Sequence, residues 1–164
     1  MHRISGRVWK YGNDINTDVI FPGKYTYTII DPKEMARHAL EDLDPGFAFL
    51  VKPGDVILGG DNFGCGSSRE QAVICLKEAG VGAVVARSFA RIFYRNCINM
   101  ALPAVVCNQA VNELETGDEM EIDFEDGKII AGELAFSFSA FPDAVLGIIR
   151  AGGIVSYTEL RLRS

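Results

Sequence analysis

The sequence lacks the features that mark nucleic-acid-binding and membrane proteins. Its 22 acidic and 16 basic residues leave a net charge of -6, so no general attraction draws it to a phosphate backbone or an anionic membrane. No apolar run reaches the roughly 18 residues of a membrane span, and residues 1–20 contain no continuous apolar signal segment. These absences predict a soluble, cytoplasmic protein with no nucleic acid and no membrane among its partners.

Cysteine is sparse, and its spacing is not that of a metal site. Cys65, Cys75, Cys97 and Cys107 include no C-x-x-C pair, the arrangement that lets one turn hold a metal or a cluster. Disulfides are not expected without a secretory signal. We therefore expect reduced thiols that lie mostly in the core, with only Cys65 near the chemistry, and no metal bound by this chain.

Composition and length favour one domain with an ordinary core. The chain has 164 residues, of which 48% are hydrophobic and 23% are charged. That balance is typical of a globular domain rather than a disordered chain. Residues 1–164 contain no internal repeat, low-complexity tract or linker, so we expect a single domain.

Strand and helix patterns alternate along the middle of the chain. Residues 55–60, 81–86 and 103–107 are short apolar runs, and helical patterns at 68–80 and 88–100 separate them. Such runs are typical of strands covered on both faces. The alternation predicts an α/β fold with a largely parallel central sheet and right-handed helical crossovers.

The two ends of the chain carry further patterns. They predict a strand, a helix, a β-rich hairpin region and a short helix, at residues 2–12, 31–43, 118–138 and 142–153. The first helix has Asp31 as N-cap and Pro32 at its first position, and Pro45 and Gly46 follow its end. The hairpin turn is expected at residues 125–127.

A glycine-rich loop, "GGDNFGCGSSREQA" at residues 59–72, joins a predicted strand to a predicted helix. At the carboxyl end of a parallel strand, the following helix offers unpaired N–H groups to an anion. A P-loop is excluded because no lysine lies between Gly59 and Leu76. The loop therefore predicts an anion-binding site of another kind.

Two alternatives for this loop stay open. Gly64 and Gly66 begin a dinucleotide G-x-G-x-x-G pattern, but Arg69 stands at its third glycine, where a side chain obstructs helix packing. A nucleotide-binding regulatory domain, with Arg87 on a 2′-phosphate, is one alternative. A helix cap is the other, formed by Ser67 with Glu70, or by Ser68 with Gln71 in a second register.

Three segments resemble the small, swivelling domain of the aconitase superfamily. They are "GNDINTDVIFPGKY", "GDNFGCGSSRE" and "SFARIFYRN" followed by "LPAVV", in that order. The length resembles the separate small subunit of a 3-isopropylmalate dehydratase-type enzyme. The resemblance implies a single swivelling β/β/α domain with a C-terminal β-rich part.

The resemblance also implies a function. Enzymes of this family are hydro-lyases that move a hydroxyl between adjacent carbons of a small dicarboxylate by dehydration and rehydration. Their 4Fe-4S cluster is held by a large subunit and acts as a Lewis acid. The chain is thus expected to bind no cofactor itself, to require that large subunit as its partner, and to serve leucine biosynthesis.

The matched segments carry the residues that the family uses. Ser67 matches the catalytic serine, an alkoxide base that needs nearby N–H groups and cations. Arg69 matches the substrate-carboxylate clamp, while Ser68 and the backbone of Gly66 are expected to bind substrate. Asp18 matches an active-site acid, although a turn-forming role is an alternative for it.

The loop at residues 23–30 corresponds to the family's substrate-selecting loop. Lys24 is its one cation, and Tyr25, Thr26 and Tyr27 offer a weakly polar lining. A third substrate carboxylate would need a cation, whereas an alkyl branch would not. The loop predicts conversion of 2-isopropylmalate to 3-isopropylmalate, with dimethylmalate dehydratase or homoaconitase as alternatives.

Two further positions are noted. Gln71 stands where the family often has a histidine, so a proton-transfer role at that position is in doubt. Arg87, Arg91 and Arg95 are spaced to share one helix face. We expect Arg87 and Arg95 to face solvent, and Arg91, which matches a family position, to help close the site.

Overall fold

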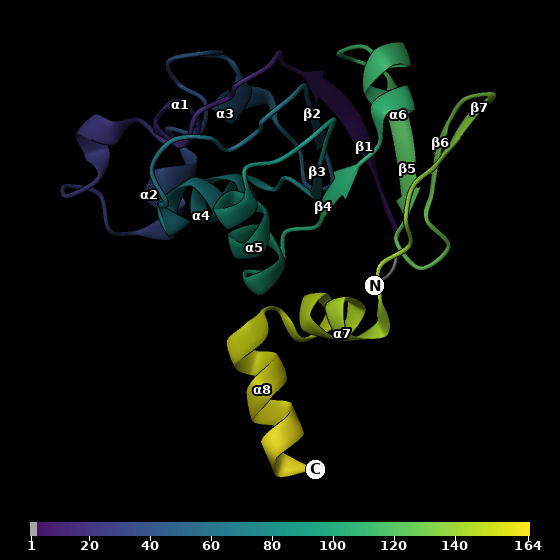
Figure 1. Ribbon diagram of the computed structural model, residues 1–164. Coiled ribbons are helices and arrows are strands. Elements are labelled where there is room, and N and C mark those ends of the chain that lie inside the picture. Colours follow the sequence, from purple (N-terminus) through teal and green to yellow (C-terminus); the bar gives the residue numbers. More distant parts are fainter. Residues whose placement is uncertain (1–2) are drawn as a thin grey trace.

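The computed structural model describes residues 3–164 as helices around a seven-stranded sheet of order β4-β3-β2-β1-β5-β6-β7 (Figure 1). The strands are β1 (Arg3–Lys10), β2 (Val56–Gly59), β3 (Ala83–Ala86), β4 (Ala104–Val106), β5 (Glu119–Asp123), β6 (Lys128–Ala131) and β7 (Leu134–Ser137). The helices are α1 (Thr17–Ile20), α2 (Pro32–Ala36), α3 (Phe47–Leu50), α4 (Glu70–Ala79), α5 (Arg91–Asn99), α6 (Asn108–Glu113), α7 (Asp143–Ala151) and α8 (Ile154–Arg163), with a 3-10 turn η1 (Gly23–Tyr25). His2, which the predicted first strand included, lies outside the described residues.

Strand β1 joins a parallel half of the sheet to an antiparallel half. Its end, at Val8 to Lys10, runs parallel to β2, and β3 and β4 continue in the same direction. Its beginning, at Arg3 to Arg7, pairs antiparallel with β5, and the β5-β6-β7 meander follows. The α/β class, the largely parallel sheet and the β-rich C-terminal part are confirmed.

Burial explains why the parallel strands are so apolar. All residues of β2 and β3 are buried, because apolar clusters lie on both faces of these strands. One cluster holds Ile57 and Val84 together with α4 side chains, and the other holds Val56 and Val85 together with the antiparallel strands. The strands thus need apolar side chains in both directions, as expected for a covered parallel sheet.

The loops that follow β1, β2 and β3 meet at one edge of the sheet. Isolated parallel bridges join Asn16 to Cys65 and Phe63 to Phe89. The amide of Gly64 also donates to the carbonyl of Ile15 at 2.8 Å. The carboxyl edge of a parallel sheet is where α/β proteins place their ligands, and here it is built from three loops tied together.

The helix predicted at residues 31–43 is shorter than expected. Asp31 caps it as predicted, through its side chain and the amide of Lys33, but α2 ends at Ala36. The amide of Leu40 instead donates to the carbonyl of Ile20 at 2.8 Å, and Leu40 is fully buried with a φ of 55°. Packing against α1 has overridden the local helix preference.

The C-terminal region differs from its predicted pattern in two ways. Residues 128–138 form two strands rather than one, because Gly132, with a φ of 59°, turns the chain between β6 and β7. Helix α7 begins after Pro142 as expected. A further helix, α8, which the sequence patterns did not predict, follows it and extends away from the sheet at the yellow end of the chain (Figure 1).

Within residues 3–164, no helix is long and apolar enough to cross a membrane.

Candidate active site

The glycine loop has a backbone that only glycine adopts readily. Gly64 and Gly66 have φ values of 82° and 92°, in the left-handed region that side chains disfavour. A β-carbon on Gly66 would lie 2.7 Å from Oδ1 of Asn16, and one on Gly64 would meet the ring of Phe93. These two glycines therefore allow the loop to pass close to the β1 loop and to α5.

The helix cap predicted for Ser67 or Ser68 is not formed. Helix α4 begins at Glu70, its N-cap is Arg69, and no side-chain hydrogen bond caps it. The extended Arg69 separates the serines from the helical turn. The capping interpretation of both serines is wrong, and both residues are exposed just before a helix N-terminus, where the partial charge is positive.

The exposed serines line a cavity of about 290 Å³ at the carboxyl edge of the sheet. Gly66 and Arg69 line it with them, so the structure brings together four of the residues expected to form the site. Helix α5 provides the opposite wall. The other lining residues are Thr17, Gly64, Ala90, Arg91, Ile92, Phe93 and Asn96.

Arg69 is held in place by acceptors on α1, on its C-cap Phe21 and on Thr26 at the end of η1. Its Nη1 donates to Oδ1 of Asp18 at 2.9 Å and to the Thr26 hydroxyl at 2.8 Å, and its Nη2 donates to the carbonyl of Phe21. The side chain is only 13% exposed, and its buried Nε has no hydrogen-bond partner among the described residues. Asp18 thus lies beside the predicted clamp rather than serving only as a turn former.

Thr17 is a site residue that the sequence reasoning missed. It is 1% exposed, and its hydroxyl donates to the carbonyl of Ser67 at 2.8 Å. Its amide donates to the carbonyl of Cys65 at 2.9 Å. Thr17 therefore fixes the backbone on both sides of Gly66. Thr17 stands next to Asp18 in one of the segments that resemble the aconitase superfamily, and this position could have identified it. Asn96, which also lines the cavity, lies in another of these segments.

The start of the substrate-selecting loop is attached to the segment after α2. Nζ of Lys24 lies 3.9 Å from Oε2 of Glu41, and the rings of Tyr25 and His38 are 4.2 Å apart. Desolvation and the nearby Glu41 carboxylate raise the pKa of Tyr25. A hydrogen bond from His38 is the main cause that lowers the pKa of Glu41. Neither Lys24 nor Tyr25 lines the cavity of the serines.

In the rest of this loop, Thr26 forms hydrogen bonds with Arg69 and Gln71, whereas the ring of Tyr27 is exposed. Thr26 accepts from Arg69 through its hydroxyl, and its carbonyl accepts from Nε2 of Gln71 at 2.9 Å. Tyr27 is 94% exposed. Gln71 stands where the family often has a histidine, and here its side chain donates a hydrogen bond to the loop.

The three arginines do not share one helix face. Arg87 lies before α5 and donates to Oδ1 of Asn112, so the prediction of a solvated helix position is wrong for it. Arg91 and Arg95 lie on α5, both are exposed, and Arg91 lines the cavity of the serines. Arg87 does not line the cavity of the serines.

The cysteines are distributed as expected for reduced thiols. Cys75, Cys97 and Cys107 are buried, Cys65 is half-buried, and all are free. Burial raises the pKa of the Cys75 and Cys97 thiols. Among residues 3–164 there is no group of three or more histidine, cysteine, aspartate or glutamate side chains that could hold a metal ion.

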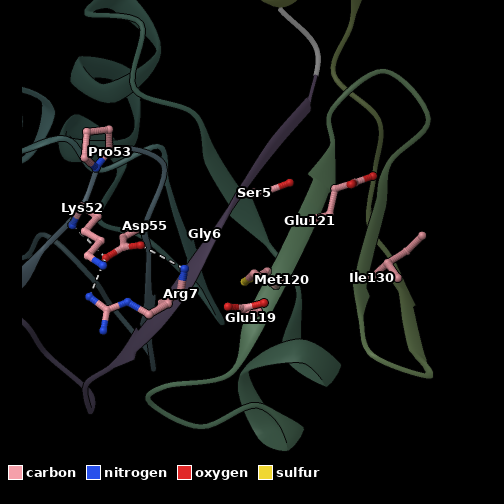
Figure 2. Close-up of a pocket in the computed structure, with 10 residues that line it drawn as sticks. All are labelled: Ser5, Gly6, Arg7, Lys52, Pro53, Asp55, Glu119, Met120, Glu121 and Ile130. Atoms are coloured by element: carbon pink, nitrogen blue, oxygen red, sulfur yellow. Dashed lines mark hydrogen bonds and ion pairs between the residues drawn. The ribbon is translucent and has the colours of Figure 1, made fainter.

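A larger hollow, of about 520 Å³, lies where β1 and β5 pair, and Figure 2 shows its lining. Asp55 lies at its edge, 3% exposed, and accepts hydrogen bonds from Nε1 of Trp9 and from the amides of Lys52 and Arg7 at 2.9 to 3.0 Å. Burial alone would raise the pKa of Asp55, but these hydrogen bonds lower it. We interpret Asp55 as a structural carboxylate and the hollow as the open face of an antiparallel sheet.

Comparisons with known proteins now bear on this site. The aconitase C-terminal domain family matches residues 48–110, which include the glycine loop and the first turn of α4. The 3-isopropylmalate dehydratase small subunit of Clostridium acetobutylicum is 49% identical over 156 residues, covering 94% of this chain and 95% of that protein.

The chain belongs to the 3-isopropylmalate dehydratase small-subunit family.

Other relatives of this small-subunit family agree in length and fold. The 2,3-dimethylmalate dehydratase small subunit of Eubacterium barkeri is 48% identical over 157 residues, covering 94% of this chain and 96% of that one. A crystal structure of 3-isopropylmalate dehydratase from Methanocaldococcus jannaschii has a TM-score of 0.91 at 44% identity, covering 98% of this chain and 95% of that one. The aconitase X structure of Thermococcus kodakaraensis, at 16% identity and a TM-score of 0.54, shares the fold alone.

Membership of this family argues against the alternative that the glycine loop belongs to a nucleotide-binding regulatory domain. It also places the chain among the small subunits of hydro-lyases related to aconitase.

Proposed function

We propose that this chain is the small subunit of a hydro-lyase that isomerises an alkyl-substituted malate, with conversion of 2-isopropylmalate to 3-isopropylmalate as the favoured reaction. The observation that carries the proposal is the convergence of Ser67, Ser68 and Arg69 on one cavity in a member of this family. The family names include both isopropylmalate and dimethylmalate enzymes, so dimethylmalate is the second candidate substrate.

Ser67 is proposed as the base that takes a proton from the carbon beside a substrate carboxylate. Serine is a weak base in water, so its alkoxide must be stabilised by its surroundings. Here the exposed hydroxyl is not engaged as a helix cap, and it precedes the N-terminus of α4. The positive end of that helix favours the alkoxide over the neutral hydroxyl.

Arg69 is proposed as the clamp for a substrate carboxylate. A guanidinium can bind two carboxylate oxygens through parallel N–H groups. Its Nη1 contacts with Asp18 and Thr26 orient the group before substrate arrives, and Ser68 lines the same cavity. Binding then exchanges some of these partners for the substrate carboxylate, while the peptide carbonyl of Phe21 stays as an anchor.

The alkyl branch is favoured over a third carboxylate because the selecting loop has no unpaired cation. Lys24 is the one cation of residues 23–30, and it lies near Glu41 and over the ring of Tyr25. Bringing Lys24 to a distal carboxylate would require breaking both contacts. A homocitrate or citrate substrate would therefore need its third charge balanced from outside this loop.

The reaction is completed by a large subunit, which we propose as the partner of this chain. The described residues include no group of three or more histidine, cysteine, aspartate or glutamate side chains that could hold a metal ion, and we propose that the large subunit holds the iron-sulfur cluster. A 4Fe-4S cluster on the large subunit would supply a Lewis acid for the departing hydroxyl. A cytoplasmic location and a role in leucine biosynthesis stay predictions.

The test is anaerobic co-expression with a large subunit, followed by kcat/KM measurements on 3-isopropylmalate, 2,3-dimethylmalate, homocitrate and citrate. We expect an alkylmalate to be the best substrate. A clear preference for a tricarboxylate would contradict the assignment of the loop. Absence of activity on all four in a cluster-loaded complex would contradict the function.

A further inference from the structure

Thr26 connects the substrate-selecting loop to two residues at the start of α4. Its hydroxyl accepts from Nη1 of Arg69 at 2.8 Å, and its carbonyl accepts from Nε2 of Gln71 at 2.9 Å. The hydroxyl also donates to the carbonyl of Gly23 at 2.8 Å. A hydroxyl has one hydrogen to donate, so with that hydrogen on Gly23 it can only accept from Arg69, and the network is consistent.

Among residues 27–30 of this loop only Ile29 is buried, at 6% exposure, and it packs in the core. Tyr27 is 94% exposed and Ile30 is 84% exposed. The first residues, Lys24 and Tyr25, are held by the segment after α2. The hydrogen bond from the Gln71 side chain to the Thr26 carbonyl attaches the main chain at the centre of this loop to α4.

We propose that Gln71 is a positioning residue that sets the substrate selectivity of the enzyme, and this proposal rests on the proposed function. By fixing the Thr26 carbonyl, it holds the selecting loop at one distance from Arg69. The position of the loop that is expected to select the substrate branch is thereby coupled to the position of Arg69, the proposed clamp for its carboxylate. Releasing the loop should change which branch is preferred.

The chemistry of glutamine suits this role. Its amide donates a hydrogen bond without titrating, whereas a histidine changes charge between about pH 5 and 8. Gln71 is half-buried on α4, and Arg69 faces the same threonine. Glu41 pairs with His38 and Lys24 at the loop's start, and the contact of Gln71, an amide with a main-chain carbonyl, contains no titratable group.

The first experiment measures release of the loop directly, in the free chain and without any activity assay. Chymotrypsin should cut after Tyr27 only when the loop opens, and local opening controls such cleavage. Gln71→Met removes the donor at similar size. We expect cleavage after Tyr27 to become about five-fold faster, relative to cleavage after Phe49, which is 83% exposed and serves as an internal reference.

Two variants keep the result interpretable. Gln109→Met makes the same change at an exposed position of α6 and should leave the cleavage ratio unchanged. Gln71→His retains an N–H donor and should stay within about two-fold of the native ratio, even if Gln71→Met folds poorly. An unchanged ratio for Gln71→Met, or equal acceleration by Gln109→Met, overturns the proposal.

The second experiment measures selectivity in the reconstituted complex. For Gln71→Met, we expect the ratio of kcat/KM values for 3-isopropylmalate over 2,3-dimethylmalate to change at least three-fold, mainly through KM. A purely structural role would lower both values together and leave their ratio constant, which overturns the proposal. A native complex with no dehydratase activity would refute the proposed function, while the cleavage result would still test the contact.

Discussion

Replacing Thr17 with valine should weaken both folding and catalysis through one hydrogen bond. The two side chains have nearly the same shape, so Thr17→Val leaves no cavity, but it removes the hydroxyl that donates to the carbonyl of Ser67 at 2.8 Å. Thr17 is 1% exposed, so water cannot easily replace that donor. The perturbation therefore tests the backbone support of the proposed base rather than the base itself.

The expected size follows from the burial of the bond. Leaving this part-buried carbonyl without its donor costs about 1 to 2 kcal/mol after the apolar gain of valine. For a chain of 164 residues, that lowers Tm by about 2 to 8 °C. Because small displacements of a reacting group are costly, kcat of the reconstituted complex should fall about ten-fold even at saturating substrate.

The assay compares Thr17→Val with two controls. Thr17→Ser keeps the hydroxyl and should recover most of kcat. Thr116→Val removes an exposed hydroxyl that accepts from the amide of Lys10 at 2.9 Å, far along the chain, and should leave kcat unchanged. A Thr17→Val complex with native kcat and native Tm would refute the claim that this hydrogen bond positions Ser67.

Three further outcomes are expected. Arg69→Lys should reduce kcat/KM by at least 100-fold with little effect on cluster content, because a point charge cannot bind two carboxylate oxygens in parallel, and steady-state kinetics checks this. Gly66→Ala should destabilise the chain in thermal unfolding, because its φ is 92° and a β-carbon would lie 2.7 Å from Asn16. Since the pKa of Asp55 is lowered in the folded chain, its stabilisation is present above about pH 4 and is lost as the pH falls through the folded value. Urea unfolding of Asp55→Asn should show a flatter pH dependence there than the native chain.

The sequence predicted the central fold well because local pattern and tertiary environment agree there. The runs at 55–60, 81–86 and 103–107 place apolar side chains on both faces of their strands. In the structure, β2 and β3 are buried on both faces. The end of α4 at Gly80, with a φ of 104°, is equally local in origin, because glycine adopts the left-handed conformation readily. Such elements are determined by neighbouring residues, so a single sequence contains enough information to find them.

Elements that depend on distant contacts were missed or misjudged. The predicted helix at residues 31–43 ends early because the amide of Leu40 pairs with Ile20, a contact that no local pattern reveals. The apolar and polar residues of helix α8 are not clearly separated onto opposite faces, and Leu160 and Leu162 are exposed. Its sequence therefore lacks the periodic pattern that predicts an amphipathic helix. Arg87 was counted with α5 because spacing alone does not reveal that the helix begins at Arg91.

The residues of the candidate site were predicted one by one, but the hydrogen bonds that hold them in place were not. Resemblance identified Ser67, Ser68, Arg69 and Gly66, which the structure places around one cavity. It did not identify the hydrogen bonds from Thr17 to the Ser67 carbonyl or from Gln71 to the Thr26 carbonyl. Both link a side chain to a main-chain oxygen far away in sequence, and such contacts leave no trace in residue type or spacing.

The most direct test of the account is the turnover of Ser67→Ala in a fully cluster-loaded complex with the large subunit. We expect kcat on 3-isopropylmalate to fall by about 10²- to 10⁴-fold, as for loss of a general base, with unchanged cluster content. Because Ser67 does not cap α4, Tm should match that of a Ser139→Ala control. A near-native kcat for Ser67→Ala would contradict the central claim that this chain supplies the base.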